Sequence, residues 1–325
     1  MKKILFISKG ADASSTRYRA LQFFPLLQSA GFVPVHHTIG GGVRSYLLAL
    51  RLAQQSDYVV VLRKTFPSVY LYLLRKYARR LFFDFDDAIF CNTDGALSAT
   101  RMKRFAAMAR LADHITAGNE FLAGQAKAFN TAVTVIPTSI DPDRYGISVI
   151  KPDDHIDLVW IGSKATRKYL TDAIPWIALA ANHIPNLRLK IIADFDLTNS
   201  AIQTLPVEWH KETEAAELAS SHIGIAPMRD DDWSRGKCAL KVLQYMAAGL
   251  PVVSSKAGAN TEIIGNGHCG YLATSQQDWV DCLASLAADP ELRRTMGKAG
   301  MARVKSEFSL AAAFADMRAT LEKVG

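Results

Sequence analysis

Short apolar runs of the length of β-strands alternate with longer stretches of helical period along almost the whole chain. This alternation is typical of βαβ units, in which a helix returns the chain so that successive strands lie parallel. In the first half the predicted strands are residues 3–8, 32–36, 57–62, 80–84, 114–117 and 133–137. The pattern restarts with predicted strands at residues 157–162, 187–193, 222–227, 251–255 and 270–273. The sequence therefore predicts an α/β fold with mostly parallel sheets.

The predicted helices fall between these strands. Residues 16–30 form the clearest one, with Ser14, Ser15 or Thr16 available as the N-cap, and Pro25 should kink or divide it. In the second half the predicted helices are residues 169–183, 236–249, 277–288, 291–308 and 309–324.

The length of the chain predicts two domains. Single hydrophobic cores stop growing near ~250 residues, and this chain has 325. Residues 141–154 contain two prolines and a glycine without a periodic pattern, which is typical of a linker. We expect domains at residues 1–150 and 151–308, followed by a terminal helix, residues 309–325, that could cross back to the first domain.

The positive charge lies in the first half of the chain. Residues 1–150 hold 19 Lys and Arg against 10 Asp and Glu, whereas the remainder holds 19 against 21. Residues 63–80 concentrate this charge and interleave it with aromatic and aliphatic side chains. Such a stretch can lie against an anionic membrane or grip an acidic acceptor, and it can equally be a solvated helix face. No nucleic-acid-binding motif accompanies it, so no nucleic-acid partner is expected.

The cysteines and the N-terminus favour a cytoplasmic protein. The four cysteines are scattered and form no CxxC pair, which indicates a reducing compartment. The apolar run at residues 4–7 is too short for a signal peptide or a membrane span. We expect a cytoplasmic location, with peripheral contact at the inner face of the plasma membrane through the basic first half.

Four segments resemble a known family and occur in its order. They read VIPTSID at residues 135–141, VWIGS at 159–163, GKCALKVLQYMAAGLPVVSS at 236–255 and GANTEI at 258–263. Together they resemble GT-B glycosyltransferases, particularly the retaining family four, also called glycosyl transferases group 1. The resemblance implies two Rossmann-like domains with parallel sheets facing across a cleft, the first on the acceptor side and the second binding the donor.

The resemblance also implies a function. A sugar would pass from a UDP- or GDP-linked donor to a glycan or lipid-linked acceptor, with retention and without a metal or other cofactor. Many members of this family act in polysaccharide biosynthesis at the cell envelope, and the resemblance implies the same for this chain. Two alternatives stay open: a GT-B enzyme without transfer, such as a nucleotide-sugar epimerase or a phosphorylase, and a catalytically silent GT-B binding protein.

A diphosphate needs backbone N–H groups, a helix N-terminus and mobile positive charge. We expect Gly236 to begin a helix whose dipole favours an anion, with Lys237, Lys241 and Gln244 along one face. An ordinary exposed face would show the same spacing. Because retaining enzymes of this type are thought to rely on stabilisation of the leaving group, Lys237 and Lys241 are the predicted catalytic cations.

The chain departs from the family at two glutamates. The family usually carries an E-x7-E spacing here, and this chain has Gly236 and Gln244 instead. An amide can also bind the ribose hydroxyls, so Gln244 stays a predicted donor ligand. The sugar-reading group is sought just upstream, among Asp231, Asp232, Trp233 and Ser234.

The turn after Gly162 is the second donor segment. Ser163 and Thr166 can bond phosphate oxygens. The cation that the family places here is replaced by one of Lys164, Arg167 and Lys168, and the sequence does not choose among them. In the family the nucleobase lies near a loop that corresponds to Trp209, which is a predicted stacking surface or a core aromatic residue.

The acceptor side is predicted on the first domain. The loop after its first strand supplies Ser15, Arg17 and Arg19, and the two arginines could hold a phosphate or be exposed helix-start residues. Asp86 and Asp87 follow a strand at the edge where α/β sheets bind ligands. Asp86 is predicted to orient the acceptor hydroxyl or act as a base. A helix cap, or a metal-binding DxD motif of the other major transferase fold, is the alternative for this segment.

Overall fold

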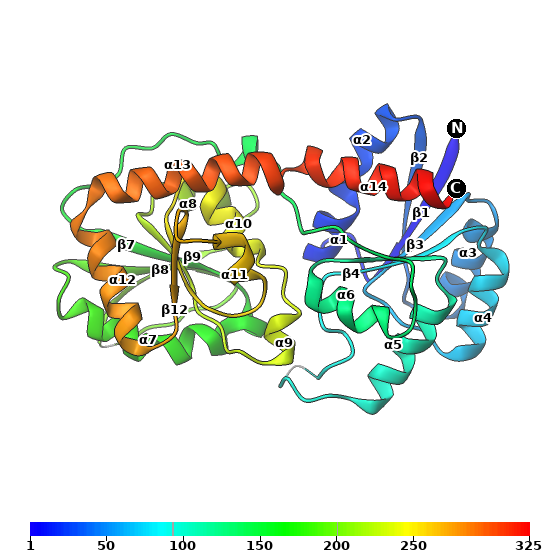
Figure 1. Ribbon diagram of the computed structural model, residues 1–325, viewed down its shortest axis with the longest axis horizontal. Coiled ribbons are helices and arrows are strands. Elements are labelled where there is room, and N and C mark those ends of the chain that lie inside the picture. The colour runs from blue at the N-terminus through cyan, green and yellow to red at the C-terminus, as the bar shows by residue number, and fades with distance from the viewer. Residues whose placement is uncertain (93, 200) are drawn as a thin grey trace. The chain divides into compact units, whose positions relative to one another are not determined.

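The computed structural model describes residues 1–92, 94–199 and 201–325. The chain forms two compact units (Figure 1). Unit 1 comprises Met1–Ser139, Asp231–Cys238 and Leu310–Gly325, and unit 2 comprises Ile140–Asp230 and Ala239–Ser309. The short segment Asp231–Cys238 interrupts the sequence of unit 2 but packs with unit 1, and we describe it there.

Unit 1 is a six-stranded parallel sheet with the strand order β2-β1-β3-β4-β5-β6. Leu5 of β1 pairs with Val35 of β2 on one side and with Val59 of β3 on the other. Its elements are β1 (Lys2–Ser8), α1 (Ser14–Arg19), η1 (Leu21–Phe23), α2 (Phe24–Ser29), β2 (Phe32–Thr38), α3 (Val43–Gln54), β3 (Tyr58–Leu62), α4 (Ser68–Tyr77), β4 (Leu81–Phe85), α5 (Ala99–Leu111), β5 (His114–Ala117), α6 (Glu120–Lys127), β6 (Val133–Val135), α9 (Asp232–Arg235) and α14 (Leu310–Val324).

Unit 2 is a second six-stranded parallel sheet, with the order β12-β11-β10-β7-β8-β9. Its elements are η2 (Pro142–Arg144), β7 (Ile156–Ile161), η3 (Lys164–Thr166), α7 (Arg167–Ala181), β8 (Leu187–Ala193), β9 (Gln203–Glu208), α8 (Glu214–Ala219), β10 (Ile223–Ala226), α10 (Leu240–Ala247), β11 (Val252–Ser255), α11 (Ala259–Ile264), β12 (Gly270–Ala273), α12 (Gln276–Ala288) and α13 (Pro290–Glu307).

The predicted parallel α/β architecture is confirmed. The strands predicted at residues 114–117, 187–193 and 270–273 end where β5, β8 and β12 end. The predicted division of the helix at residues 16–30 is also confirmed, because α1, η1 and α2 occupy it and Pro25 lies in the first turn of α2. Edge strand β9 was not expected, since Pro206 and polar residues weaken its strand pattern.

The C-terminal helix α14 completes the core of unit 1. Leu321 and Ala313 pack with Ile4, Phe6 and Phe82 on one face of the sheet. The helix is also tied to the sheet by hydrogen bonds to its carbonyls: Tyr58 Oη donates to the Leu321 carbonyl at 3.3 Å and Arg80 Nε to the Val324 carbonyl at 2.8 Å. No helix in the described part of the chain is long and apolar enough to cross a membrane.

Unit 2 contains a buried histidine that should make its stability depend on pH. His222 Nδ1 accepts the Asp157 N–H at 3.0 Å, and Nε2 lies 3.0 Å from the Pro152 carbonyl. Burial lowers the pKa of His222, and the nearby Lys151 and Arg293 lower it further, although the Pro152 carbonyl and Asp157 raise it. A folded-state pKa below the unfolded value gives stability that is present above about pH 6.5 and is lost as the pH falls through and below it.

We therefore expect the melting temperature to fall as the pH is lowered from 8 to 5.5. The melting temperature of the His222→Asn variant should fall less steeply over the same range. Asparagine keeps an acceptor near the position of Nδ1 but does not titrate. His36 and His114 also have pKa values lowered by burial, so the comparison is between the two slopes and not with a flat profile. Equal slopes, measured by circular dichroism melts, would contradict the assignment.

Candidate active site

A glycine turn ends the central strand of unit 2. Strand β7 lies where the strand order reverses between β10 and β8, and such switch points bind ligands at the carboxyl ends of the strands. Gly162 follows β7 directly. A Cβ on Gly162 would lie 2.2 Å from the buried ring of Trp160 and 2.8 Å from Thr166 Oγ1. Only glycine therefore fits at this position.

The turn after Gly162 is held by its own hydrogen bonds. The Ser163 N–H donates to Thr166 Oγ1 at 3.2 Å, and that hydroxyl donates back to the Ser163 carbonyl at 3.2 Å. The Lys164 N–H donates to Asp194 Oδ1 at 2.9 Å, a carboxylate that sequence reasoning did not single out. Ser163, Lys164 and Arg167 are exposed. Their donor-binding roles stay predictions.

Lys241 lies beside this turn. Its ammonium group is 4.4 Å from the centre of the Trp160 ring, the same ring that touches Gly162. Lys241 is also in the first turn of α10, where the helix dipole favours an anion. Trp160 thus brings together the glycine turn and a predicted catalytic lysine that lie 79 positions apart in the sequence.

The predicted helix over residues 236–249 is wrong at its beginning. Helix α10 begins at Leu240, after Ala239 takes a left-handed conformation with φ of 51°. Gly236 is instead the C-cap of the short helix α9. Lys237 therefore does not share a helical face with Lys241 and Gln244. The reason lies in contacts of residues 235–238 with unit 1, which use backbone groups that a continuous helix would need.

These contacts are close and specific. Asn119 Nδ2 donates to the carbonyls of Arg235 at 3.0 Å and Lys237 at 3.1 Å. A Cβ on Gly236 would lie 2.7 Å from the Ala88 backbone nitrogen, so glycine is required for this approach. Asp231 caps α9 by accepting the Ser234 N–H at 2.7 Å. Segment 231–238 is therefore built against the carboxyl ends of β4 and β5.

Four predicted residues meet in a cluster around charged groups on unit 1. Lys237 Nζ donates to both oxygens of Asp87, at 2.9 and 3.0 Å, and lies 4.1 Å from the centre of the Trp233 ring. Arg63 pairs with Asp87 as well, and its Nε lies 3.3 Å from Asp86 Oδ1. That Asp86 oxygen is buried and accepts no hydrogen bond from a described residue. Arg63 was missed because nothing local marks it, although its left-handed φ of 47° is a sign of a special position.

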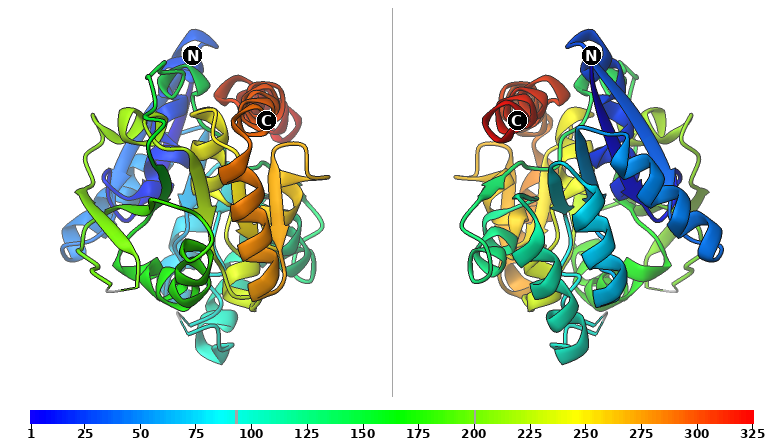
Figure 2. Two further views of the ribbon diagram at one scale, coloured as in Figure 1. Left: turned by 90° about the vertical axis from the view of Figure 1, so that its left-hand side faces the viewer. Right: turned by 90° about the vertical axis from the view of Figure 1, so that its right-hand side faces the viewer.

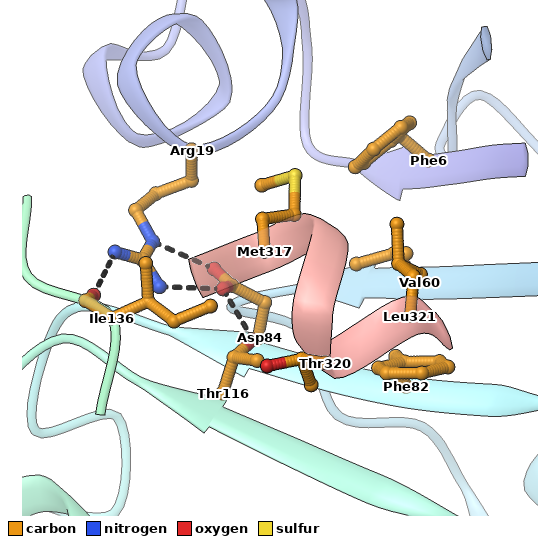
Figure 3. A pocket seen from close by; sticks show the side chains of 10 residues that line it. All are labelled: Phe6, Arg19, Val60, Phe82, Asp84, Thr116, Ile136, Met317, Thr320 and Leu321. Carbon is orange, nitrogen blue, oxygen red and sulfur yellow. Dashed lines mark hydrogen bonds and ion pairs between the residues drawn. The ribbon is translucent and has the colours of Figure 1, made fainter. Parts of the chain in front are cut away.

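The expectation that Arg19 could hold a phosphate is corrected by the structure. Figure 3 shows Arg19 directed at Asp84 beneath α14. Its Nε and Nη2 donate to Asp84 at 3.0 and 2.6 Å, and Nη1 donates to the Ile136 carbonyl. Burial alone would lower the pKa of Arg19, but Asp84 more than offsets this and holds the pKa above its usual value. The side chain is 4% exposed, and each of its three nitrogens already donates a hydrogen bond, so it has no face for a ligand.

The pocket in Figure 3 is not a substrate site. Its volume is about 20 Å³, which is room for one water-sized molecule, and it lies between α14 and strands β1, β3, β4 and β5. Its lining is apolar apart from Arg19, Asp84, Thr116 and Thr320. Ser15 and Arg17, which precede Arg19 on α1, are partly exposed, and their acceptor role stays a prediction.

Three predicted donor residues are buried. Ser234 is fully buried, so it cannot read a sugar, and this prediction is wrong. Gln244 is 4% exposed, and its Nε2 donates to Tyr145 Oη at 3.1 Å and to Glu214 Oε1 at 2.9 Å. Its amide therefore joins a structural network, and a contact with ribose would have to use Oε1. Gly236 is also buried, whereas Asp232 and Trp233 are partly exposed and remain candidates.

Glu214 is the centre of the network that holds Gln244. It accepts hydrogen bonds from Tyr145 Oη at 2.6 Å and from Trp209 Nε1 at 2.7 Å. Trp209, the predicted stacking surface, is half-buried and oriented by this bond. Glu214 carried no sequence signal, because a glutamate in a short helix is normally exposed. Among the described residues, no group of three or more His, Cys, Asp or Glu side chains could hold a metal ion.

Comparison with solved structures defines the class. Sucrose-phosphate synthase (tll1590) from Thermosynechococcus elongatus superposes with a TM-score of 0.78 at 14% identity, over 100% of this chain and 99% of that one. Anabaena Alr3699/HepE, solved in complex with UDP-glucose, gives a TM-score of 0.71 at 14% identity, over 99% and 100%. The chain has the two-domain α/β fold of GT-B glycosyltransferases.

Sequence comparison adds the family of the second half. Residues 155–289 match the family described as Glycosyl transferases group 1. A D-inositol 3-phosphate glycosyltransferase from Pseudarthrobacter chlorophenolicus is 28% identical over 39% of this chain and 29% of its own length. An MMP alpha-(1->4)-mannosyltransferase from Mycolicibacterium hassiacum is 32% identical over 34% and 27%. The chain thus spans less than a third of the length of these relatives. The family match covers the segment that contains Gly162 and Lys241.

Proposed function

We propose that this protein transfers a sugar from a nucleoside-diphosphate donor to a hydroxyl of a glycan or lipid-linked acceptor. One observation carries the proposal: Lys241 and the Gly162 turn meet through Trp160 at the switch point of unit 2. This edge of the sheet lies in the segment that matches group 1 glycosyltransferases. A cation, a helix N-terminus and a glycine turn are the groups that a diphosphate requires.

Transfer needs little covalent chemistry from the protein. The acceptor oxygen forms a bond to the anomeric carbon as the bond from that carbon to the β-phosphate oxygen breaks. Lys241 stabilises the negative charge that develops on the leaving diphosphate. The acceptor proton passes either to an oxygen of the leaving diphosphate or to Asp86. The first route is the one proposed for retention, and neither route uses a metal. Asp86 follows β4 at the carboxyl end of the sheet of unit 1 and is only partly buried, which supports its role toward the acceptor hydroxyl.

The donor is a UDP- or GDP-linked sugar. The complex of Alr3699/HepE with UDP-glucose supports UDP as the first choice. Trp209 and Trp233 are the partly exposed aromatic side chains of the predicted donor residues and could stack on a base or a sugar ring. We further propose a cytoplasmic location and a part in assembling envelope polysaccharide, since the basic first half suits an acidic or membrane-borne acceptor.

Isothermal titration with UDP, GDP and a panel of their sugars tests this function. We expect one nucleotide class to bind at micromolar concentration, with slow hydrolysis of the sugar when no acceptor is present. The hydrolysis rate is measured from the nucleoside diphosphate that is released. Release of an altered free sugar would indicate an epimerase instead. Absence of binding to every donor would indicate a catalytically silent protein.

A further inference from the structure

Helices α3 and α4 of unit 1 expose an unusual amount of apolar surface. They lie side by side, and the right-hand view of Figure 2 brings this side of the molecule to the viewer. The most exposed large apolar side chains of these two helices are, with their exposed fractions, Val43 (74%), Leu47 (60%), Leu48 (46%), Val69 (77%) and Tyr72 (66%). We call this set with its neighbouring cations, Arg44, Arg51 and Lys76, the α3–α4 face.

The α3–α4 face is not a poorly packed part of the core. The two helices meet each other through Tyr46 and Tyr70, whose ring centres are 4.8 Å apart, and through the bond from Tyr70 Oη to the Tyr46 carbonyl. Their inner sides place Ala49, Leu71 and Leu74 in the core of unit 1. The exposed residues follow helical spacing, at 44, 47, 48 and 51 on α3 and at 69, 72 and 76 on α4. Each helix therefore has two apolar sides, of which one is unpartnered in unit 1.

The charge on this face is of one sign. Arg44, Arg51 and Lys76 are exposed and form no ion pair with a described residue. Neither helix contains Asp or Glu. Between residues 13 and 83 the chain has ten Lys and Arg and a single acidic residue, Asp57. Whatever covers the face must therefore be apolar and anionic at once.

This combination selects among occupants. A second copy of the chain, packed face to face, would bring Arg44, Arg51 and Lys76 against their own equivalents without a carboxylate to balance them. A nucleic acid would balance the charge but would leave Val69 and Leu47 with no apolar partner. An anionic bilayer supplies both parts, because phosphate headgroups meet the cations while aliphatic side chains enter the acyl boundary.

Helix α5 shows that charge alone does not define the face. It carries Arg101, Lys103, Arg104 and Arg110 and no carboxylate, yet its one large apolar side chain at the surface is Leu111, at 38%. The α3–α4 face joins the two properties. We propose that it is a membrane-docking surface that holds the protein on anionic lipid. The proposal deepens the proposed function by placing the acceptor at a membrane, but it concerns binding to lipid and needs no donor or transfer.

Vesicle co-sedimentation tests the proposal on the full chain without donor or acceptor. Vesicles of phosphatidylcholine alone are compared with vesicles that also contain roughly one third phosphatidylglycerol. We expect binding to the anionic vesicles, release at high salt, and little binding to the neutral ones. Failure of the unaltered chain to bind anionic vesicles would overturn the docking surface while leaving glycosyl transfer untouched, because transfer is measured separately on a soluble acceptor.

Two triple variants and a matched control locate the surface. Arg44→Gln with Arg51→Gln and Lys76→Gln should weaken binding about 100-fold, since each cation contributes roughly five- to tenfold. Leu47→Ser with Val69→Ser and Tyr72→Ser should weaken it by at least about 100-fold, since roughly five- to tenfold is expected per apolar side chain that enters the bilayer. The control, which removes the same charge from exposed lysines elsewhere, is Lys298→Gln with Lys305→Gln and Lys323→Gln.

The control should bind anionic vesicles like the unaltered chain. If the control lost as much binding as the charge variant, net charge alone would cause the binding, and the assignment to the α3–α4 face would be overturned. All substituted residues are exposed, so the variants should keep the melting temperature of the parent within a few degrees. Sedimentation of the free protein as a dimer that the apolar variant abolishes would identify a second copy as the occupant instead.

Discussion

Replacing Lys241 by alanine is expected to lower donor turnover by about 100-fold or more. The ammonium group lies 4.4 Å from the centre of the Trp160 ring, which also contacts Gly162. Removal of one preorganised charge stabiliser typically costs a factor of 10² to 10³ in kcat. Lys241→Arg should recover part of the rate, because it keeps the charge with a different geometry. The measurement is release of nucleoside diphosphate under saturating donor, with Lys298→Ala as a surface control.

The same assay separates the two predicted lysines. Lys237 is held by both oxygens of Asp87, so part of its charge is already balanced. We therefore expect Lys237→Ala to lower turnover less than Lys241→Ala. Turnover of Lys241→Ala equal to that of the unaltered chain would remove this residue from the site. A larger loss at Lys237 would move the diphosphate toward segment 231–238.

Removal of Arg19 is expected to lower the free energy of unfolding by about 3–5 kcal/mol, because it leaves a buried carboxylate without its cation. Among the described residues, Asp84 would then keep one side-chain donor, the hydroxyl of Thr116 at 2.6 Å. Arg19→Met should therefore lower the free energy of unfolding by more than the small change in side-chain volume would suggest. The double variant with Asp84→Asn should recover much of the loss, since neither charge is then buried alone.

Urea denaturation followed by circular dichroism measures this effect. The matched control is Arg79→Met, which breaks an ion pair to Asp57 of similar length, 3.0 Å, but with Arg79 72% exposed. An exposed pair of this kind is worth less than about 1 kcal/mol. If Arg19→Met were as mild as Arg79→Met, the buried pair would not stabilise unit 1, and the phosphate-binding hypothesis for Arg19 would have to be reopened.

Much of the fold could be predicted because strand patterns are local. The run Ile4–Ile7 is apolar throughout and forms the middle of parallel strand β1, where the side chains are buried on both faces. Gly270–Ala273 and Leu187–Ala193 were also predicted from their own few residues, and their predicted bounds agree with β12 and β8. The Gly162 turn could also be predicted locally, since a glycine turn is recognised from the strand pattern before it and the helix pattern after it.

The site was less predictable because its partners are distant in the sequence. A helical pattern over residues 236–249 predicts one helix, but Asn119 binds the carbonyls of Arg235 and Lys237 and holds that stretch open. Nothing near Gln244 indicates that Glu214, thirty positions away, would accept its amide hydrogen. These hydrogen bonds exist only once the sheets have formed.

The sequence by itself determined the two parallel α/β sheets and the glycine turn at the end of β7, because hydrophobic period and backbone freedom act within a few residues. Only the tertiary structure decided that Arg19 neutralises Asp84 in the core of unit 1, that segment 231–238 packs with that unit, and that Lys241 lies over Trp160. Charged side chains have no preferred partner along the chain. Their role is set by burial and by the opposite charge or ring that folding brings within a few ångströms.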